Sequence, residues 1–196
     1  MKQVLIIHGG TSFSSYAAYR TYLDKKVIDI DKLTTPIRWK ENLGNNLPGY
    51  QVIYPSMPNS TNAVYDEWVI YFEKLLPLLE NDVQILGHSL GAMFLAKYFN
   101  GHTPAVPFRR LILVAGGYND DSNEDLGSFR VSSAKAVSKC AEEVHLIHSK
   151  DDPVVPYTEL AKFQNDLPQA ITHSFDDRGH FTDETFPEIL ELLKKA

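Results

Sequence analysis

The stretch ILGHSLGA, residues 85–92, contains a Gly-x-Ser-x-Gly pattern at Gly87, Ser89 and Gly91. An apolar run precedes the pattern and helical periodicity follows it, so the serine is predicted at a strand-to-helix turn. Such a serine adopts a strained backbone conformation, and flanking glycines let the two backbones approach closely. Its hydroxyl is exposed at a helix start, where the Leu90 N–H can stabilise an oxyanion. The stretch therefore predicts a nucleophilic Ser89, and a packing turn whose serine caps the helix is the alternative.

Five further apolar runs resemble the run before this serine, and together the six predict the strands of one sheet. The runs are residues 3–8, 50–55, 82–87, 109–116, 142–149 and 170–175. Their near-continuous hydrophobicity is typical of parallel strands that are covered on both faces. Helical periodicity predicts helices over residues 64–79, 89–99, 158–166 and 184–195, with Pro77 bending or ending the first. This alternation predicts a doubly wound α/β sheet with its ligand crevice at the carboxyl ends of the strands.

Two stretches fit this alternation poorly. Residues 14–48 are too long for one crossover helix, and residues 116–130 form a long connection rich in carboxylates. Long connections at the carboxyl edge of a sheet often form a lid or a specificity wall, and a plain surface loop is the alternative. The second connection is acidic, because it has one cation, Arg130, and the four carboxylates of Asp120, Asp121, Glu124 and Asp125. These carboxylates would disfavour anionic substrates if the connection bordered the site.

Composition limits the class of protein. The chain has 196 residues, of which 43% are hydrophobic, so we expect one domain over residues 1–196 with a single core. Its net charge is −6 and it has no basic run, which argues against nucleic acid as a partner. Cys140 is the only cysteine, which excludes an intrachain disulfide and favours a reducing compartment and a buried apolar role. The apolar run in MKQVLIIHGG is too short for a signal peptide or a membrane span, so we expect a cytoplasmic protein without membrane association.

A serine hydroxyl needs a nearby base to remove its proton, and the chain has seven histidines. His180, in DDRGHFTDE, follows the last predicted strand and precedes an apparent helix start at residues 182–184, so it can lie over the carboxyl edge. We favour it as the base, with a solvated loop histidine as the alternative. His8 ends the first strand, and His88 should point away from its neighbour Ser89.

The remaining histidines are less suitable. His145 and His148 are three residues apart on a predicted strand, which places them on opposite faces and excludes a paired metal site. His102 and His173 do not occupy a loop beside the carboxyl end of a strand. No motif predicts a cofactor or a metal.

The base must be oriented by a carboxylate, and SKDDP follows the strand before the one that leads to the histidine. The resulting order is serine, aspartate, histidine. Of Asp151 and Asp152, the second precedes Pro153, which favours an extended backbone and supplies no N–H. Asp152 is therefore predicted to hold the histidine, and Asp151 to be solvated or to cap the turn.

A second oxyanion donor should come from the loop after the first strand. There IIHGGTSFSS offers Gly9 and Gly10, where the backbone can approach a substrate closely. We predict the Gly10 N–H as the donor, with Thr11 as the alternative. The chain lacks a G-x-G-x-x-G motif and a Walker lysine, so a phosphate-binding or dinucleotide-binding loop is disfavoured.

These motifs resemble those of the small α/β-hydrolase-fold serine hydrolases of the retinoblastoma-binding protein 9 type and their bacterial relatives. The resembling segments are LIIHGG, YPSMPNSTNAVYDEWV, ILGHSLGA, LILVAG, SKDDPVVP and DRGHF, and MPN with a tryptophan ten residues on is the more family-specific. The resemblance implies a three-layer fold with a mostly parallel sheet of about six strands, helices on both faces, no separate cap domain, and no counterpart of the superfamily's first two strands. It also implies a catalytic triad with Ser89 as nucleophile, His180 as base and Asp152 as the third member.

The chain departs from this family at about twenty residues, 16–36, which form an insertion before Trp39 relative to the family pattern and could cover the site. The family's roles include esterase-like and aminopeptidase-like activity and protein binding. We expect hydrolysis of a small ester, thioester or amide through an acyl-enzyme on Ser89. A non-catalytic module that binds a protein partner, and acyl transfer to an acceptor other than water, are the alternatives.

Overall fold

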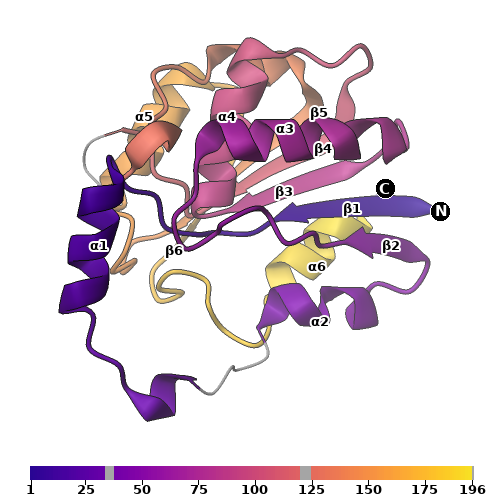
Figure 1. The fold of residues 1–196 in the computed structure, drawn as a ribbon. Coiled ribbons are helices and arrows are strands. Elements are labelled where there is room, and N and C mark those ends of the chain that lie inside the picture. The colour runs from indigo at the N-terminus through magenta and orange to yellow at the C-terminus, as the bar shows by residue number, and fades with distance from the viewer. Residues whose placement is uncertain (34–37, 120–124, 196) are drawn as a thin grey trace.

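A computed structural model of the chain describes residues 1–33, 38–119 and 125–195. All six predicted strands are present in one sheet, in the order β2-β1-β3-β4-β5-β6 (Figure 1). Every neighbouring pair is parallel, so the sheet is more regular than the mostly parallel sheet that was expected. The strands are β1 (Lys2–Ile7), β2 (Tyr50–Ile53), β3 (Gln84–His88), β4 (Phe108–Val114), β5 (Ala141–Ser149) and β6 (Ile171–Phe175).

The helices confirm most of the predicted periodicity. They are α1 (Tyr16–Lys25), α2 (Trp39–Asn46), α3 (Tyr65–Leu75), α4 (Leu90–Gly101), α5 (Thr158–Asp166) and α6 (Pro187–Lys194), with 3₁₀ turns η1 (Ile30–Leu33), η2 (Leu76–Leu78), η3 (Gly127–Phe129) and η4 (Lys135–Lys139). Pro77 lies in η2 and ends the regular helix, as predicted.

The predicted start of the last helix is wrong. The helix begins at Pro187 rather than at residues 182–184, and Phe186 before it has non-helical backbone angles, φ −140° and ψ 77°, and a buried ring. A residue before proline avoids helical dihedral angles, whereas the proline itself is favoured at the first helical position. The six residues after His180 therefore form a loop that anchors the histidine to the core through Phe181 and Phe186.

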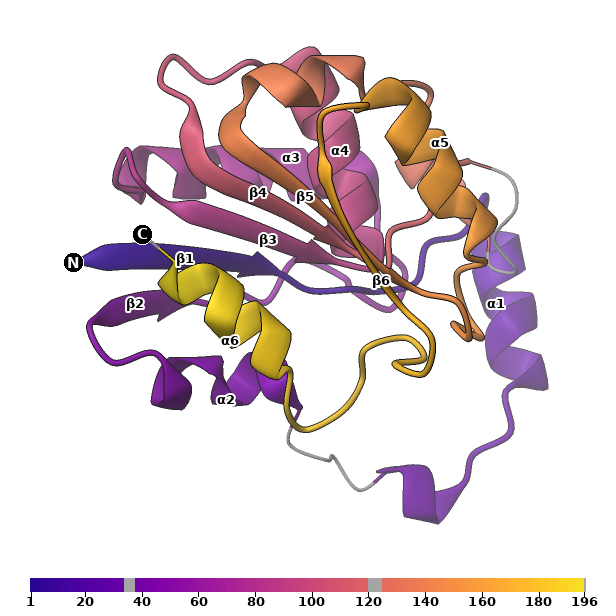
Figure 2. The same ribbon diagram turned by 180° about the vertical axis from the view of Figure 1, so that it is seen from behind.

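Side-chain alternation along the strands divides the core into two layers. In β1, Val4 and Ile6 join the cluster under α2 and α6, whereas Leu5 and Ile7 join the larger cluster under α3, α4 and α5. Figure 2 shows α2 and α6 together on one face of the sheet, with α3 and α4 on the other. The predicted three-layer architecture is confirmed, and the carboxyl ends of all six strands meet at one edge.

The first crossover contains three helical pieces, α1, η1 and α2, because it is too long for one. Helix α1 begins after Ser15, whose hydroxyl accepts a hydrogen bond from the Ala18 N–H at 3.1 Å. It contributes no buried residue to the core. Both views place it beyond the carboxyl ends of the strands (Figures 1 and 2). Residues 34–37 of the predicted insertion lie outside the described residues.

The acidic connection 116–130 is only partly described, since Asp120, Asp121 and Glu124 fall in the undescribed residues 120–124. The Asp125 carboxylate accepts a hydrogen bond from the Ser14 N–H at 2.8 Å, so this connection is joined to the start of the first crossover. Cys140 is buried as predicted, and burial raises the pKa of its thiol to about 11. Within the described residues, no helix combines the length and apolar character that crossing a membrane requires.

Candidate active site

Ser89 occupies the turn between β3 and α4 with φ 57° and ψ −122°, a backbone conformation that is strained for a residue with a side chain. Its N–H donates to the Val114 carbonyl at 2.8 Å, which holds the turn against the neighbouring strand. In the described structure its hydroxyl does not cap the helix, and it lies 2.9 Å from Nε2 of His180 instead. The helix-capping alternative is therefore wrong.

The glycines on either side of this serine are required by close backbone contacts. A Cβ on Gly91 would overlap the Ile7 carbonyl and lie 2.6 Å from the His8 carbonyl oxygen, and one on Gly87 would lie 2.6 Å from the Gly91 oxygen. Helix α4 therefore starts in direct contact with the end of β1. This contact brings Ser89 beside the loop of Gly9 and Gly10.

Replacing Gly91 with alanine should lower the free energy of unfolding by about 3 kcal/mol, because the new methyl group meets backbone oxygens that cannot move aside. Urea denaturation monitored by circular dichroism measures the change. Gly101→Ala in the same helix is the matched control, since no atom lies within 4 Å of its added Cβ. Equal denaturation midpoints for the two variants would show that the turn tolerates a side chain.

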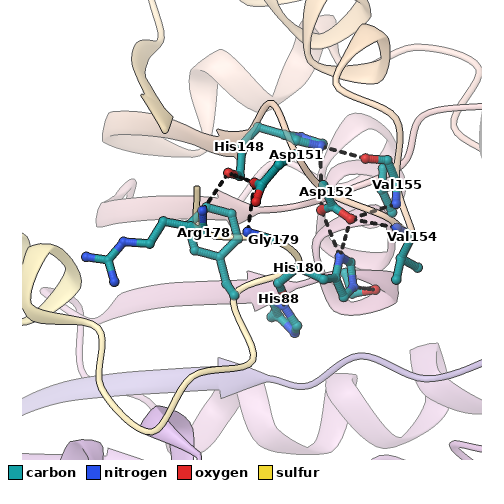
Figure 3. Close-up of polar contacts among 12 residues, drawn as sticks. His88, His148, Asp151, Asp152, Val154, Val155, Arg178, Gly179 and His180 are labelled. Atoms are coloured by element: carbon teal, nitrogen blue, oxygen red, sulfur yellow. Dashed lines mark hydrogen bonds and ion pairs between the residues drawn. The ribbon is translucent and has the colours of Figure 1, made fainter. Parts of the chain in front are cut away.

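His180 is joined to both of its predicted partners. Its Nδ1 lies 2.8 Å from Oδ2 and 3.1 Å from Oδ1 of Asp152 (Figure 3). Its other ring nitrogen, Nε2, lies 2.9 Å from Oγ of Ser89. A carboxylate accepts only, so Nδ1 carries the hydrogen and Nε2 is left to accept from the serine hydroxyl. The structure thus brings Ser89, His180 and Asp152 into one chain of hydrogen bonds, with the imidazole in the tautomer that a general base requires.

The Asp152 carboxylate is fully buried and its position is defined by several partners. Oδ1 accepts hydrogen bonds from the N–H groups of Val154 and Val155 at 2.8 and 2.9 Å (Figure 3). On the other side, Nε2 of His148 lies 3.8 Å from Oδ2 and is hydrogen-bonded to the Val155 carbonyl at 3.0 Å. Backbone donors compensate a buried carboxylate for lost water, so the side chain is held as a charged group beneath the imidazole.

Asp151, which the sequence predicted to be solvated or to cap the turn, has a different set of partners. Its Oδ1 accepts from the Ser149 hydroxyl at 2.5 Å and from the Gly179 N–H at 2.9 Å. The Ser149 Oγ in turn accepts from the Arg178 N–H at 2.9 Å (Figure 3). The Ser149 hydrogen bond lowers the pKa of the Asp151 carboxyl below its ordinary value. Asp151 therefore ties the loop that carries His180 to the end of β5, without contacting the imidazole.

On the opposite side of Ser89, the loop after β1 supplies the predicted oxyanion residues. Gly10 lines the same cavity as Ser89, and a Cβ on it would lie 2.5 Å from the Ser60 carbonyl oxygen. The Thr11 N–H already donates to that carbonyl at 2.9 Å, so Thr11 is a poorer candidate than Gly10. Leu90 is the first residue of α4, where backbone N–H groups have no acceptor within the helix. Gly10 and Leu90 remain the two proposed donors.

The MPN motif and its distant tryptophan support this loop. The Met57 N–H donates to Nε2 of His8 at 2.8 Å, and the Trp68 indole N–H donates to the Pro58 carbonyl at 2.7 Å. Asn59 has a positive φ of 48°, which turns the chain toward Ser60. The motif therefore places the Ser60 carbonyl against the glycines after β1, and His8 serves as a structural acceptor.

An open cavity of about 500 Å³ lies at this edge. It is lined by His8, Gly9, Gly10, Thr11, Arg38, Lys40, Glu41, Tyr54, Ser60, His88, Ser89, Val154, His180 and Thr182. Arg38 is the only described residue of 14–38 in this lining, and no described residue of 116–130 belongs to it. In the structure as described, neither predicted lid covers Ser89.

Sequence reasoning missed His88 and Lys40 in this lining. The His88 ring lies beside His180, with ring centroids 4.9 Å apart. Burial, with Lys40 and His180 adding to it, holds the pKa of His88 well below its ordinary value. Lys40 follows Trp39 in a short polar helix, where a lysine ordinarily indicates an exposed face, so no sequence signal marked it.

The described residues contain no group of three or more histidine, cysteine, aspartate or glutamate side chains placed to hold a metal ion. His145 lies 3.0 Å from His173 and 3.2 Å from the Glu143 carboxylate, within a polar network between β5 and β6. His102 stacks on Tyr98 at the end of α4. These histidines are structural partners remote from Ser89.

Comparisons with known proteins agree with this geometry. A family model described as serine hydrolase matches residues 34–194. The chain is 29% identical to serine hydrolase RBBP9 of Rattus norvegicus over 160 residues, which cover 80% of this chain and 83% of that protein.

Solved structures show the same fold. The ydeN gene product from B. subtilis has a TM-score of 0.74 and 20% identity, with 98% of this chain and 97% of that chain covered. A YdeN-like hydrolase from Pectobacterium atrosepticum has a TM-score of 0.66 and 16% identity, with 98% and 89% covered. The expected α/β-hydrolase fold is therefore confirmed, and the described residues include no separate cap domain.

Proposed function

Because the chain belongs to the serine hydrolase family, we propose that it hydrolyses small carboxylic esters through an acyl-enzyme on Ser89. The observation that carries this proposal is the unbroken chain of hydrogen bonds from Ser89 through His180 to Asp152, with distances of 2.9 and 2.8 Å. The strained turn at Ser89 further supports it, since it directs the hydroxyl into the cavity.

In the first step the Ser89 oxygen attacks the substrate carbonyl while Nε2 of His180 takes the hydroxyl proton. The carbonyl π electrons move to oxygen, and the N–H groups of Gly10 and Leu90 donate to the resulting oxyanion. Collapse of the tetrahedral intermediate breaks the bond to the leaving group, which takes the proton from His180. The acyl group is then bound to Ser89 as an ester.

Water completes the reaction. His180 removes a proton from water as the water oxygen attacks the acyl-enzyme, and a second tetrahedral intermediate forms on the same donors. Its collapse breaks the bond to Oγ of Ser89, which recovers its proton from His180 and releases the acid. Asp152 stabilises the imidazolium in both halves of the cycle.

Carboxylic esters are the proposed substrate class, ahead of thioesters and amides. The cavity is open and lined on one side by glycines, which suits a compact acyl group. An amide has a poorer leaving group than an ester, so an ester makes the smaller demand on a single histidine that acts first as base and then as acid. Within the serine hydrolase family, we therefore propose a carboxylesterase activity for this protein.

A fluorophosphonate probe tests the proposal directly. The purified protein should acquire one covalent adduct, which peptide mass spectrometry should place on Ser89. A folded protein that acquires no adduct would contradict the proposal and favour a non-catalytic binding module. Product analysis with competing alcohols, amines and thiols then separates hydrolysis from acyl transfer, since hydrolysis predicts the free acid as the main product.

A further inference from the structure

Lys40 combines burial with a place in the catalytic cavity. Its side chain starts from α2, and only 5% of the residue is exposed, yet it lines the cavity together with Ser89 and His180. Lysine is rarely buried unless it is paired with a carboxylate or another strong acceptor. Its partners therefore indicate what the cavity is built to accept.

Among the described residues the Lys40 ammonium contacts two rings, the Trp39 indole, whose centroid lies 4.9 Å from Nζ, and the His88 imidazole, with which it is hydrogen-bonded. Nζ lies 3.5 Å from Nδ1 of His88, and Nε2 of the same ring lies 2.8 Å from the His180 carbonyl. A carbonyl only accepts, so Nε2 carries the hydrogen and Nδ1 accepts from Lys40. This long hydrogen bond uses one of three ammonium hydrogens.

The described residues leave this ammonium without a charged partner. None of their carboxylates lies within ion-pair distance of Nζ, and Glu41, the one carboxylate lining the cavity, accepts from the Arg38 N–H at 3.2 Å. Burial raises the pKa of Tyr54 to about 12, and the negative charge of Glu41 adds to this shift. Burial lowers the pKa of Lys40 to about 8, with Glu41 opposing the shift and Arg38 adding to it.

Arg38 strengthens the positive character of the same wall. Its side chain is exposed at the cavity, two residues before Lys40, so the wall carries two cationic groups and one carboxylate. The described residues of the acidic connection 116–130 do not belong to the lining. An anionic group on a bound molecule would satisfy the remaining hydrogens of Lys40 and offset its burial.

We infer that the cavity is selective for esters that carry a carboxylate, which Lys40 binds directly and Arg38 approaches at the mouth. This inference rests on the proposed hydrolase function and names its substrate class. A purely structural Lys40, which only supports His88 and the His180 loop, would affect charged and neutral esters alike. The ratio of kcat/KM for a charged ester to kcat/KM for a neutral ester therefore distinguishes carboxylate binding by Lys40 from a purely structural role.

Two matched ester pairs test the inference on either side of the scissile bond. Mono-4-nitrophenyl adipate and 4-nitrophenyl hexanoate differ in the acyl group, and 4-acetoxybenzoate and phenyl acetate differ in the leaving group. Each kcat/KM is normalised to the hydroxide-catalysed rate of the same ester. In at least one pair the wild type should favour the anionic ester about tenfold or more, as a charge-assisted hydrogen bond provides.

Lys40→Met should bring this ratio close to one, and Arg38→Gln, at an exposed position, should lower it by a smaller factor. Lys150→Met is the matched control, because Lys150 is an exposed cation at the end of β5 that pairs with Asp176 outside the cavity. It should keep the wild-type ratio. A ratio at or below one in both pairs, or one that survives Lys40→Met in a folded protein, would overturn the inference.

Calorimetric measurement of adipate and hexanoate binding distinguishes a failure of the carboxylate-site inference from a failure of the proposed hydrolase function. Adipate should bind the wild type more tightly than hexanoate, and Lys40→Met should abolish the difference. Because this measurement needs no turnover, the carboxylate site is tested even if Ser89 takes no fluorophosphonate. Equal affinities in the wild type count against the site, whatever the esterase assay shows.

Discussion

Ser89→Ala is expected to lower kcat for 4-nitrophenyl acetate by about a millionfold, the scale found when a serine nucleophile is removed. The alanine variant has no oxygen to form the acyl-enzyme, and its remaining rate comes from the oxyanion donors and from binding. Steady-state kinetics with active-site titration measures the loss. Stability should change by no more than about 1 kcal/mol, because the hydroxyl makes no described helix cap.

His180→Ala provides the comparison for this result. A nucleophile and its base act as a unit, so the double variant should be little slower than either single variant. If the double variant lost activity by the product of the two single fold-losses, that result would contradict the shared role inferred from the 2.9 Å contact between Oγ of Ser89 and Nε2 of His180. Full activity in Ser89→Ala would place the chemistry elsewhere in the protein.

Asp152→Asn is expected to reduce kcat about ten-thousandfold, and the direction of its hydrogen bonds gives the reason. Oδ1 accepts from the N–H groups of Val154 and Val155, so the asparagine carbonyl must take that position. Its NH₂ group then faces Nδ1 of His180, where Oδ2 now lies 2.8 Å away. Nδ1 becomes an acceptor and the hydrogen moves to Nε2, which can no longer take the serine proton.

The adjacent residue supplies the matched control, since Asp151→Asn makes the same chemical change one position earlier. Its amide oxygen can still accept from the Ser149 hydroxyl and the Gly179 N–H, so turnover should stay within about tenfold of the wild type. The pair is measured with one ester under one set of conditions. A larger loss in Asp151→Asn than in Asp152→Asn would reverse the assignment of the two carboxylates.

The fold and the central hydrogen-bond chain could be predicted because their signals are local. The six strands are apolar runs that end in turn residues, and each proposed catalytic side chain follows one of them. The Gly-Ser-Gly turn around Ser89 and the proline after Asp152 impose backbone conformations that a few neighbouring residues reveal. The order of the strands then places Ser89, Asp152 and His180 at one edge.

The missed contacts depend on residues that are distant in sequence. Lys40 is buried because α2 packs beside His88, which is 48 residues further on, and helical periodicity alone cannot report that neighbour. The contact between Asp151 and Gly179 likewise joins two loops 28 residues apart. The last helix starts late for a local reason, the avoidance of helical angles by Phe186 before Pro187, which the sequence interpretation overlooked.

Helix α1 has a consequence for how this protein can diversify. Because it contributes no residue to the core, its length and surface can change without a matching change in packing. The crossover that contains it also supplies Arg38 to the wall of the cavity. Descendants of this chain can therefore acquire new substrate ranges by remodelling one peripheral segment, while the turn that carries the nucleophile is inherited unaltered.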